Sequence, residues 1–251
     1  MSLNGSRPRR RILHSSDLHL EQLHDLGCHS LDMLVDVGIM AAVDLVVICG
    51  DFFDSNRVKD DLVRFAVGHL KRMSVDTIIV PGNHDCLVPD SVYNRTELWK
   101  DASNVKILRD VQGETVDLPH LGISVWGKPL DTYGDGEAPL GGMPKPERNG
   151  HWHIAVAHGY FLGPKGRPWA SFQITTEEIV ASGRDYIALG DSHAFDCVAS
   201  EPVKAYYSGS PCSGTDTVAI VDLSESEGVQ VARYSLRELE VQQKRYPGSY
   251  A

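Results

Sequence analysis

The sequence predicts an α/β fold in which two β-sheets pack together in one domain, with helices on the outside. The first hundred residues alternate short apolar runs with segments of helical periodicity, the pattern of parallel strands joined by crossover helices. The second half is a succession of short strand-like segments interrupted by one helix, which indicates a second sheet. The chain has 251 residues and is 42% hydrophobic, enough to bury a core without disulfides.

In the first half, the expected strands are short and apolar and end at Ser, Gly or Pro. The expected helices carry apolar residues three and four positions apart. These elements are strands at 11–15, 44–49 and 77–80, with helices at 29–42 and 58–73 between them.

The second half contains eight further strand candidates and one helix. Thr175 opens that helix, and Glu178 three residues later completes a capping-box pattern. Residues 129–150 are rich in Gly and Pro and have no periodicity, so we expect a long functional or disordered loop. The strand candidates are residues 105–108, 114–118, 123–126, 153–157, 186–189, 205–207, 217–221 and 229–234.

The charge balance and the cysteines exclude several classes of protein. Lys and Arg total 24 against 34 Asp and Glu, giving a net charge of −10, which argues against a basic face that grips a long phosphate backbone. Bound divalent metals could still reverse the sign locally. The apolar run 45–49 is far shorter than the roughly 20 residues that cross a bilayer. Five scattered cysteines without a CxxC motif indicate reduced thiols and a cytoplasmic protein.

Metal-ligand residue types follow five of the predicted strands. Because the carboxyl ends of strands in open α/β sheets form the ligand crevice, these clusters predict one shared site. Mixed carboxylate and imidazole ligands suit Mn²⁺, Fe or Zn²⁺, and two such ions roughly 3.5–4 Å apart can clamp a phosphoryl group. The clusters are Asp17-Leu18-His19, Gly50-Asp51-Phe52-Phe53-Asp54, Gly82-Asn83-His84-Asp85, His158 and Gly190-Asp191-Ser192-His193.

In this order the five clusters resemble the signature of calcineurin-like metallophosphoesterases, which is D-x-H, G-D-x-x-D, G-N-H-D/E, a lone His and G-H-x-H. The first four are intact, and the fifth has Asp191 in place of its first His. Residues 50–55 and 207–211 further resemble SbcD-type DNA repair exonucleases. The resemblance implies a four-layer α/β/β/α sandwich of two mixed sheets over residues 11–240. A flexible N-terminus (1–10) and a C-terminal tail (241–251) would flank it, without the capping domain of SbcD-type proteins.

The resemblance also implies two divalent metal ions, most readily Mn²⁺, with Fe or Zn²⁺ as alternatives. Asp51 would bridge the two ions. The first ion would be held by Asp17, His19 and His193, and the second by Asn83, His158 and Asp191.

Three further residues of the motifs would act beside the metals. His84 would contact the phosphate and protonate the leaving oxygen, an acid role that histidine side chains commonly take. Asp54 and Asp85 would orient histidines without binding metal.

Asp191 departs from the family pattern, and two interpretations stay open. Either its carboxylate replaces the imidazole as a ligand, directly or through a water, or the second metal site is weak or empty. An added carboxylate lowers the positive charge of the centre, so we expect a weaker pull on phosphate and a preference for harder metals such as Mn²⁺.

Three functions follow from these residues. The leading hypothesis is a phosphodiesterase, nuclease-like in style, in which a metal-bound hydroxide attacks phosphorus. The alternative is a small-molecule phosphatase or cyclic-nucleotide-type phosphodiesterase with residues 129–150 as a lid. A non-catalytic scaffold is the third, although such proteins lose the acid that His84 supplies here. Phosphate esters are the expected substrates, nucleic acid stays open but not as a strongly held duplex, and no membrane partner is expected.

Other polar residues receive structural interpretations. The basic clusters at 7–11 and at Lys165 with Arg167 are expected to be solvated. Seven histidines outside the motifs are expected to lie at the surface or to have their hydrogen bonds satisfied inside the fold: His14, His24, His29, His69, His120, His151 and His153.

Overall fold

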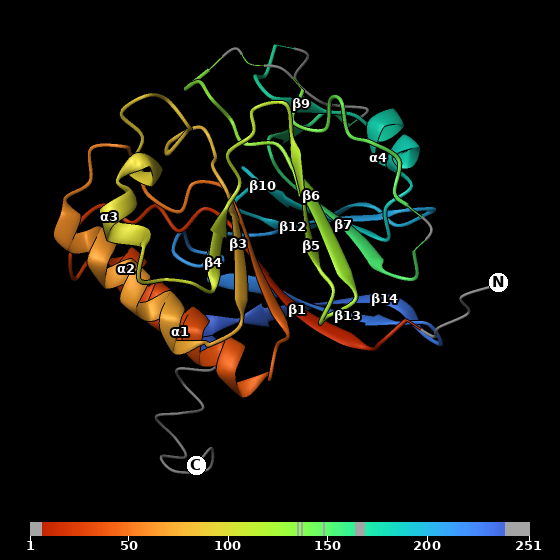
Figure 1. The fold of residues 1–251 in the computed structure, drawn as a ribbon, viewed down its shortest axis with the longest axis horizontal. Helices are drawn as coiled ribbons and strands as arrows, with labels where there is room; N and C mark the ends of the chain where they lie inside the picture. Colours follow the sequence, from red (N-terminus) through yellow and green to blue (C-terminus); the bar gives the residue numbers. More distant parts are fainter. Residues whose placement is uncertain (1–6, 135, 137, 148, 164–168, 239–251) are drawn as a thin grey trace.

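A computed structural model describes residues 7–134, 136, 138–147, 149–163 and 169–238, and it contains two six-stranded mixed sheets (Figure 1). The first sheet has the order β14-β13-β1-β2-β3-β4. Its four strands β1 to β4 are parallel, and β13 and β14 are added antiparallel. The bounds are β1 Arg10–Ser15, β2 Leu45–Cys49, β3 Asp76–Val80, β4 Val105–Ile107, β13 Thr217–Ser224 and β14 Gly228–Ser235.

The second sheet has the order β11-β12-β10-β7-β6-β5. Strands β12, β10, β7 and β6 are parallel, with β11 and β5 antiparallel at the edges. The bounds are β5 Glu114–Leu118, β6 Ile123–Gly127, β7 Trp152–His158, β10 Tyr186–Gly190, β11 Phe195–Ala199 and β12 Lys204–Ser208. The prediction of two mixed sheets is therefore confirmed.

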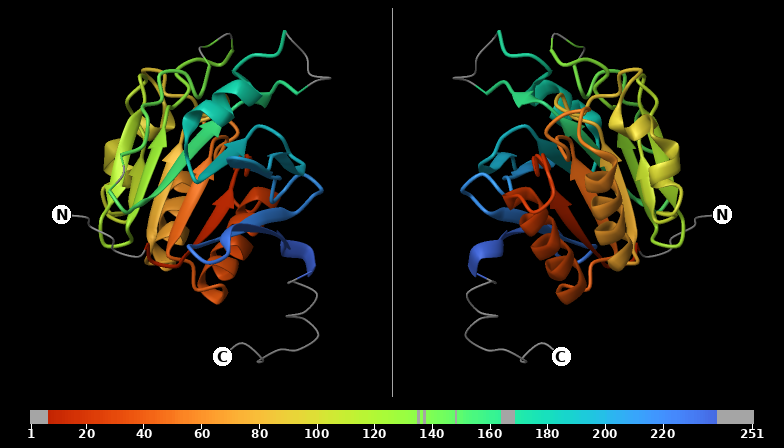
Figure 2. Two further views of the ribbon diagram at one scale, coloured as in Figure 1. Left: turned by 90° about the vertical axis from the view of Figure 1, so that its right-hand side faces the viewer. Right: turned by 90° about the vertical axis from the view of Figure 1, so that its left-hand side faces the viewer.

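Helices cover the outer face of each sheet and complete four layers, as Figure 2 shows. Helices α1 (Leu26–Met40) and α2 (Asp60–Arg72) pack on the first sheet through one apolar core. Helix α4 (Thr176–Ser182) packs on the second sheet through another, and a third core lies between the two sheets. Shorter elements connect these layers: the 3₁₀ helix Val92–Asn94, α3 Thr96–Trp99, β8 Tyr160–Phe161 and β9 Gln173–Ile174.

The continuous apolar strands of the sequence follow from this layering. In β1, Leu13 belongs to the core under the helices, whereas its neighbour Ile12 belongs to the core between the sheets. In β7, Ala155 packs toward α4 and Val156 toward the first sheet. Because successive side chains point to opposite faces and both faces are covered, apolar residues are favoured at successive positions of these strands.

The capping residues fix where two of the helices begin. Thr175 caps α4, its hydroxyl accepting from the backbone of Glu178 while the Glu178 carboxylate accepts in return, so the predicted capping box is confirmed. Helix α1 begins at Leu26, earlier than the predicted residue 29. The Asp25 side chain accepts from the Cys28 N–H at 2.7 Å and starts the helix there.

Every predicted strand is present with small shifts at its ends, but several elements were not predicted. Strand β11 lies at a sheet edge and is half-exposed, so its Phe-Asp-Cys-Val-Ala sequence lacks the apolar pattern of a buried strand. The described part of residues 129–150 holds no helix or strand, as predicted. The expected tail at 241–251, Lys165 with Arg167, and the first six residues of the expected N-terminal segment lie outside the described residues.

His14 joins the two sheets and is fully buried, which fits its interpretation as a satisfied histidine. The Tyr186 hydroxyl lies 2.9 Å from Nδ1, and the Leu189 carbonyl lies 3.1 Å from Nε2. The neutral ring uses both nitrogens, one as acceptor and one as donor. Burial lowers the pKa of His14 from 6.5 to about 3.

This burial predicts a pH dependence of stability. The folded protein resists protonation of His14 and the unfolded chain does not, so stability is fully present above about pH 6.5 and is lost as the pH falls toward 3. We expect His14 to contribute up to about 1.4 kcal/mol per pH unit to the change of the unfolding free energy with pH. Urea unfolding measured between pH 7.5 and 5 gives the free energy of unfolding at each pH. For His14→Gln this free energy should fall less steeply with decreasing pH than for the native protein. The exposed His24→Gln should keep the native slope, and parallel curves for all three proteins would contradict the prediction.

Candidate metal centre

The candidate site lies where strand ends from both sheets meet. Asp17, Asp51 and Asn83 follow β1, β2 and β3, whereas His158 ends β7 and Asp191 follows β10. The His158 Nδ1–H donates to the Cys49 carbonyl at the end of β2 (2.9 Å), and the Asp191 N–H donates to Asp17 Oδ2 (3.2 Å). Backbone and side chains of the two sheets are thus tied together at this edge.

The backbone at the site is held in an unusual conformation. Asp17, His19 and Asp51 have φ values of 55°, 45° and 49°, and Asp191 has 101°, all in the region that favours glycine. Such conformations cost free energy and persist only where the surroundings impose them. Here the loop after β1 pairs with the loop after β2, because Asp17 N–H donates to Gly50 O and His19 N–H to Asp51 O.

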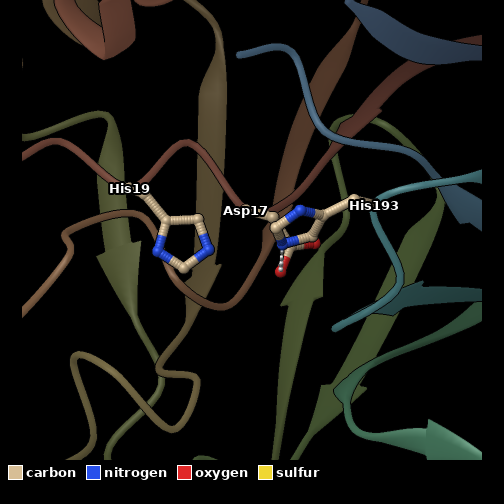
Figure 3. A group of neighbouring side chains, drawn as sticks. All are labelled: Asp17, His19 and His193. Carbon is tan, nitrogen blue, oxygen red and sulfur yellow. Dashed lines mark ion pairs between the residues drawn. The ribbon is translucent and has the colours of Figure 1, made fainter. Parts of the chain in front are cut away.

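Asp17, His19 and His193 form one group of ligand atoms, all within 4.8 Å of one another. Figure 3 shows Asp17 and His193 directed toward each other, with Oδ1 and Nε2 3.9 Å apart. Asp17 Oδ1 and His19 Nε2 are buried and have no hydrogen-bond partner within the described chain. Unpartnered buried acceptors are costly, and a cation among these atoms would remove that cost.

Asp51 belongs to two further groups, one with His19 and His84 and one with Asp17 and His158. Its Oδ2 lies 3.4 Å from His158 Nε2 and 3.9 Å from His19 Nε2. Asn83 Oδ1 lies 2.9 Å and Asp191 Oδ1 3.8 Å from that same His158 nitrogen. The structure therefore brings all eight predicted site residues into one cluster.

The pKa shifts within the cluster indicate a deficit of positive charge. Burial raises the pKa of Asp17, and the nearby Asp51 raises it further. Burial opposes ionisation of Asp51 too, but His158 outweighs it and holds the Asp51 pKa at about 2. Burial alone would lower the pKa of His158, yet Asp51 and Asp17 raise it well above its ordinary value. A proton on His158 supplies part of the missing positive charge, and a divalent cation would supply more.

Two histidines are oriented by groups outside the cluster, as metal-binding histidines usually are. His158 is fixed through Nδ1 by the Cys49 carbonyl, which leaves Nε2 to face the carboxylates. His19 Nδ1 lies 3.2 Å from Asp54 Oδ1, which again leaves Nε2 for the centre. Asp54 thus has the position expected of a histidine-orienting residue.

His84 lies at the open side of the cluster and is the most accessible of its aromatic rings together with His193. Its Nδ1–H donates to the Asp54 carbonyl (3.0 Å), and its backbone N–H donates to Asp51 Oδ1 (2.9 Å). The ring stands edge-on to His19 at 4.7 Å. Since Nδ1 is occupied by a carbonyl, Nε2 is the nitrogen available to a bound group.

Asp85 does not orient a histidine, so that expectation was wrong. Its Oδ2 accepts from the Phe52 and Phe53 N–H groups and the Tyr93 hydroxyl, and its Oδ1 accepts from the Gly82 N–H. The fully buried carboxylate fastens the loop after β2 to the loop after β3. These four donors use both oxygens of the carboxylate.

Two hydroxyl residues at the carboxyl end of β12, one inside the strand and one after it, support the ligand loops and were not assigned this role from sequence. Tyr207 donates to the Gly159 carbonyl and accepts from the Phe161 N–H, both at 2.7 Å, and so holds the turn after His158. Ser210 Oγ donates to the Asp17 carbonyl at 2.7 Å. Their place at the carboxyl end of a strand is the signal that could have identified them.

Two stacked mixed sheets that collect carboxylates, imidazoles and an amide at one edge define an α/β protein with a candidate metal centre. A sequence model of the calcineurin-like phosphoesterases matches residues 10–195. The chain belongs to this family, and the resemblance seen in its motifs is confirmed.

Two curated relatives and one solved structure extend the comparison. The uncharacterized metallophosphoesterase YhaO of Bacillus subtilis is 24% identical over 220 residues, covering 79% of this chain and 52% of YhaO. The DNA double-strand break repair protein Mre11 of Saccharolobus solfataricus is 28% identical over 129 residues, 44% of this chain and 33% of Mre11. TT1561 of Thermus thermophilus shares the fold, with a TM-score of 0.61, 10% identity and coverage of 92% of this chain and 100% of its own.

The chain spans about half the length of YhaO and a third of the length of Mre11. Among the described helices, none is long and apolar enough to cross a membrane.

The buried carboxylates predict stabilisation by divalent cations. We expect Mn²⁺ at about 100 times its dissociation constant to raise the free energy of unfolding by about 2.7 kcal/mol, and EDTA to reverse this. Asp51→Asn should lose most of the Mn²⁺ effect, because Asp51 belongs to two of the ligand groups. Thermal denaturation with and without Mn²⁺ measures it, with the exposed Asp101→Asn as control. If the melting temperature of the native protein is the same with and without Mn²⁺, these residues bind no such ion.

Proposed function

We propose that this chain is a phosphodiesterase that uses two divalent metal ions, Mn²⁺ first among them. One observation carries the proposal: Asp17 and Asp51, both buried, lie within one cluster of imidazole nitrogens, and Asp17 Oδ1 and His19 Nε2 have no other described partner. Buried charges are normally paired or bound to metal. The donor set of carboxylate, imidazole and amide fits Mn²⁺, Fe or Zn²⁺.

In this proposal Asp51 would help to hold both ions. Asp17, His19 and His193 would hold one, and Asn83, His158 and Asp191 would hold the other. The metal ions, when bound, polarise the phosphoryl group and generate the nucleophile from water. The chain's own contribution is to fix the ligands: Cys49 orients His158 through its carbonyl, and Asp54 orients His19.

His84 is the proton donor of the proposal. Its Nδ1–H is engaged by the Asp54 carbonyl, so Nε2 carries the transferable proton when the ring is charged. The ring is exposed to an approaching substrate and fixed relative to Asp51 by its own backbone N–H. A histidine placed in this way can protonate the leaving oxygen as the P–O bond breaks.

We propose short or briefly held phosphodiesters as substrates. The relative Mre11 favours nucleic acid, but the chain has a net charge of −10. The N-terminal arginines are also engaged: Arg7 pairs with Asp185 (2.8 Å) and Arg11 with Asp222 (2.8 Å). These residues therefore contribute little free positive charge toward a duplex. The five free cysteines support a reducing location such as the cytoplasm.

The central test is a metal-reconstituted assay of native protein and His84→Ala. Bis-p-nitrophenyl phosphate, p-nitrophenyl phosphate, single-stranded DNA and a cyclic nucleotide are the substrates. We expect metal-dependent hydrolysis of the diesters and a loss of about 10²–10⁴-fold in kcat for His84→Ala. Hydrolysis of the monoester alone would favour the phosphatase alternative, and no hydrolysis of any substrate would favour the scaffold.

Metal content separates two roles of His84, because its ring also lies among the ligand atoms of Asp51 and His19. In the proposal, His84→Ala keeps the native metal content. A fall in metal content together with activity would instead make His84 a ligand.

Asp191 provides a second test of the centre. Its Oδ1 lies 3.8 Å from His158 Nε2, within reach of an ion shared with that imidazole. Asp191→His removes one negative charge, so we expect tighter phosphate binding and a shift in metal preference from Mn²⁺ toward Zn²⁺. Metal analysis and phosphate inhibition measure both effects. Unchanged metal content, metal preference and turnover would show that Asp191 does not take part.

A further inference from the structure

A cavity of about 360 Å³ lies outside the metal cluster, at the carboxyl end of β6. Strand β6 is the parallel neighbour of β7, and Gly127 at its end pairs with Val156, two residues before His158. The volume lies within the range of roughly 300–1,000 Å³ typical of small-molecule sites. Its lining includes Gln112, Lys128, Leu130, Asp131, Pro139 and Phe172.

Two residues that line this cavity are hydrogen-bonded to the loops that carry the candidate ligands. The Leu130 N–H donates to the Pro81 carbonyl and its own carbonyl accepts from the Leu87 N–H, so Leu130 spans the loop that carries Asn83 and His84. On the other side, Phe172 O accepts from the Tyr160 N–H just after His158.

Gly159 shows how closely that second wall approaches the centre. A Cβ on Gly159 would lie 2.2 Å from Phe172 O and 2.8 Å from the Pro139 ring, so only glycine fits directly after His158. The cavity therefore lies beside the two loops that supply Asn83, His84 and His158.

The lining is polar on one part and apolar on another. Phe172 and Leu130 line the apolar part, and they are 6% and 4% exposed. Gln112 at the rim offers an amide that can donate and accept, and Lys128 and Asp131 bring opposite charges. A second phosphate would meet the Asp131 carboxylate, and a lipid chain would bury the charges. A flat, neutral group with a polar edge fits this lining.

We propose that this cavity is a subsite for the nucleoside part of the substrate, with the base against Phe172 and its polar edge toward Gln112. The inference rests on the proposed phosphodiesterase function and narrows its substrates to nucleotide-type diesters. An amide side chain can pair with the hydrogen-bonding edge of a base, and an aromatic ring favours stacking with it.

The test compares two diesters with the same leaving group, thymidine 5′-(p-nitrophenyl phosphate) and methyl p-nitrophenyl phosphate. In both, water attacks phosphorus and the P–O bond to p-nitrophenolate breaks; only the retained group differs. We expect the native kcat/KM to be higher for the thymidine ester. Gln112→Ala should lower this ratio about three- to tenfold, as the loss of one or two hydrogen bonds does. Gln112→Trp, which fills the mouth, should lower it on the order of tenfold or more.

The matched control is Gln230→Ala, an exposed glutamine on β14 of the other sheet, which should keep the native ratio. Turnover of the methyl ester by Gln230→Ala should stay at the native value. A ratio unchanged in both Gln112 variants would overturn the subsite while leaving the phosphodiesterase proposal intact.

Calorimetric titration with thymidine 5′-monophosphate gives a readout that needs no turnover. Binding weakened in Gln112→Ala and Gln112→Trp but not in Gln230→Ala supports the subsite. Equal binding by all four proteins, or no binding by the native protein, overturns it. Absence of hydrolysis of both esters would count against the phosphodiesterase itself, so the two failures are distinguishable.

Discussion

The burial of two carboxylates at the junction of two sheets is the constraint on which the rest of the site depends. Asp17 is 0% and Asp51 3% exposed, and a buried charge without a partner costs several kcal/mol. Neighbouring groups offset part of this cost. The Asp191 N–H donates to Asp17 and the His84 N–H donates to Asp51, and the raised pKa of His158 favours its charged form. None of these groups reaches Asp17 Oδ1. The arrangement is balanced only when further positive charge is present.

The close approach of the sheets makes that burial achievable, and it depends on glycine at two points. A Cβ on Gly190, at the end of β10, would lie 1.8 Å from the Cys49 carbonyl at the end of β2. Gly50 has φ of +82°, and a Cβ there would lie 2.2 Å from His158 Nδ1. This close approach of the sheets also brings the Cys49 carbonyl oxygen within 2.9 Å of His158 Nδ1. The packing of the sheets therefore also orients His158. Larger residues would separate the sheets and move His158 away from Asp51.

The sequence predicts that these polar residues lie together, because strand ends are visible as apolar runs that stop at Ser, Gly or Pro and parallel strands share an edge. What each polar residue does beyond that edge depends on contacts that spacing cannot reveal. Asp54 and Asp85 end two similar motifs, yet one contacts His19 and the other fastens loops through backbone N–H groups and Tyr93. Strand β11 is not recognised in the sequence, because an edge strand needs no apolar pattern. The cavity is not recognised there either, because Gln112 and Phe172 come together only through the packing of loops.

The charge balance restricts where substrate selectivity can come from. Two divalent ions with Asp17, Asp51 and Asp191 would carry a formal charge of about +1, on a chain of net charge −10. Long-range attraction of a polyanion would therefore be weak, and Asp191 as a ligand would weaken the pull of the proposed centre on the phosphoryl group itself. Binding energy must then come from short-range contacts with the organic part of the substrate, where it can also hold the phosphorus in position for attack. Such contacts need a surface that is fixed relative to the ligand loops, because contacts with a mobile surface would not hold the phosphorus in place. Leu130 and Phe172 meet that requirement through their backbone hydrogen bonds to Pro81, Leu87 and Tyr160.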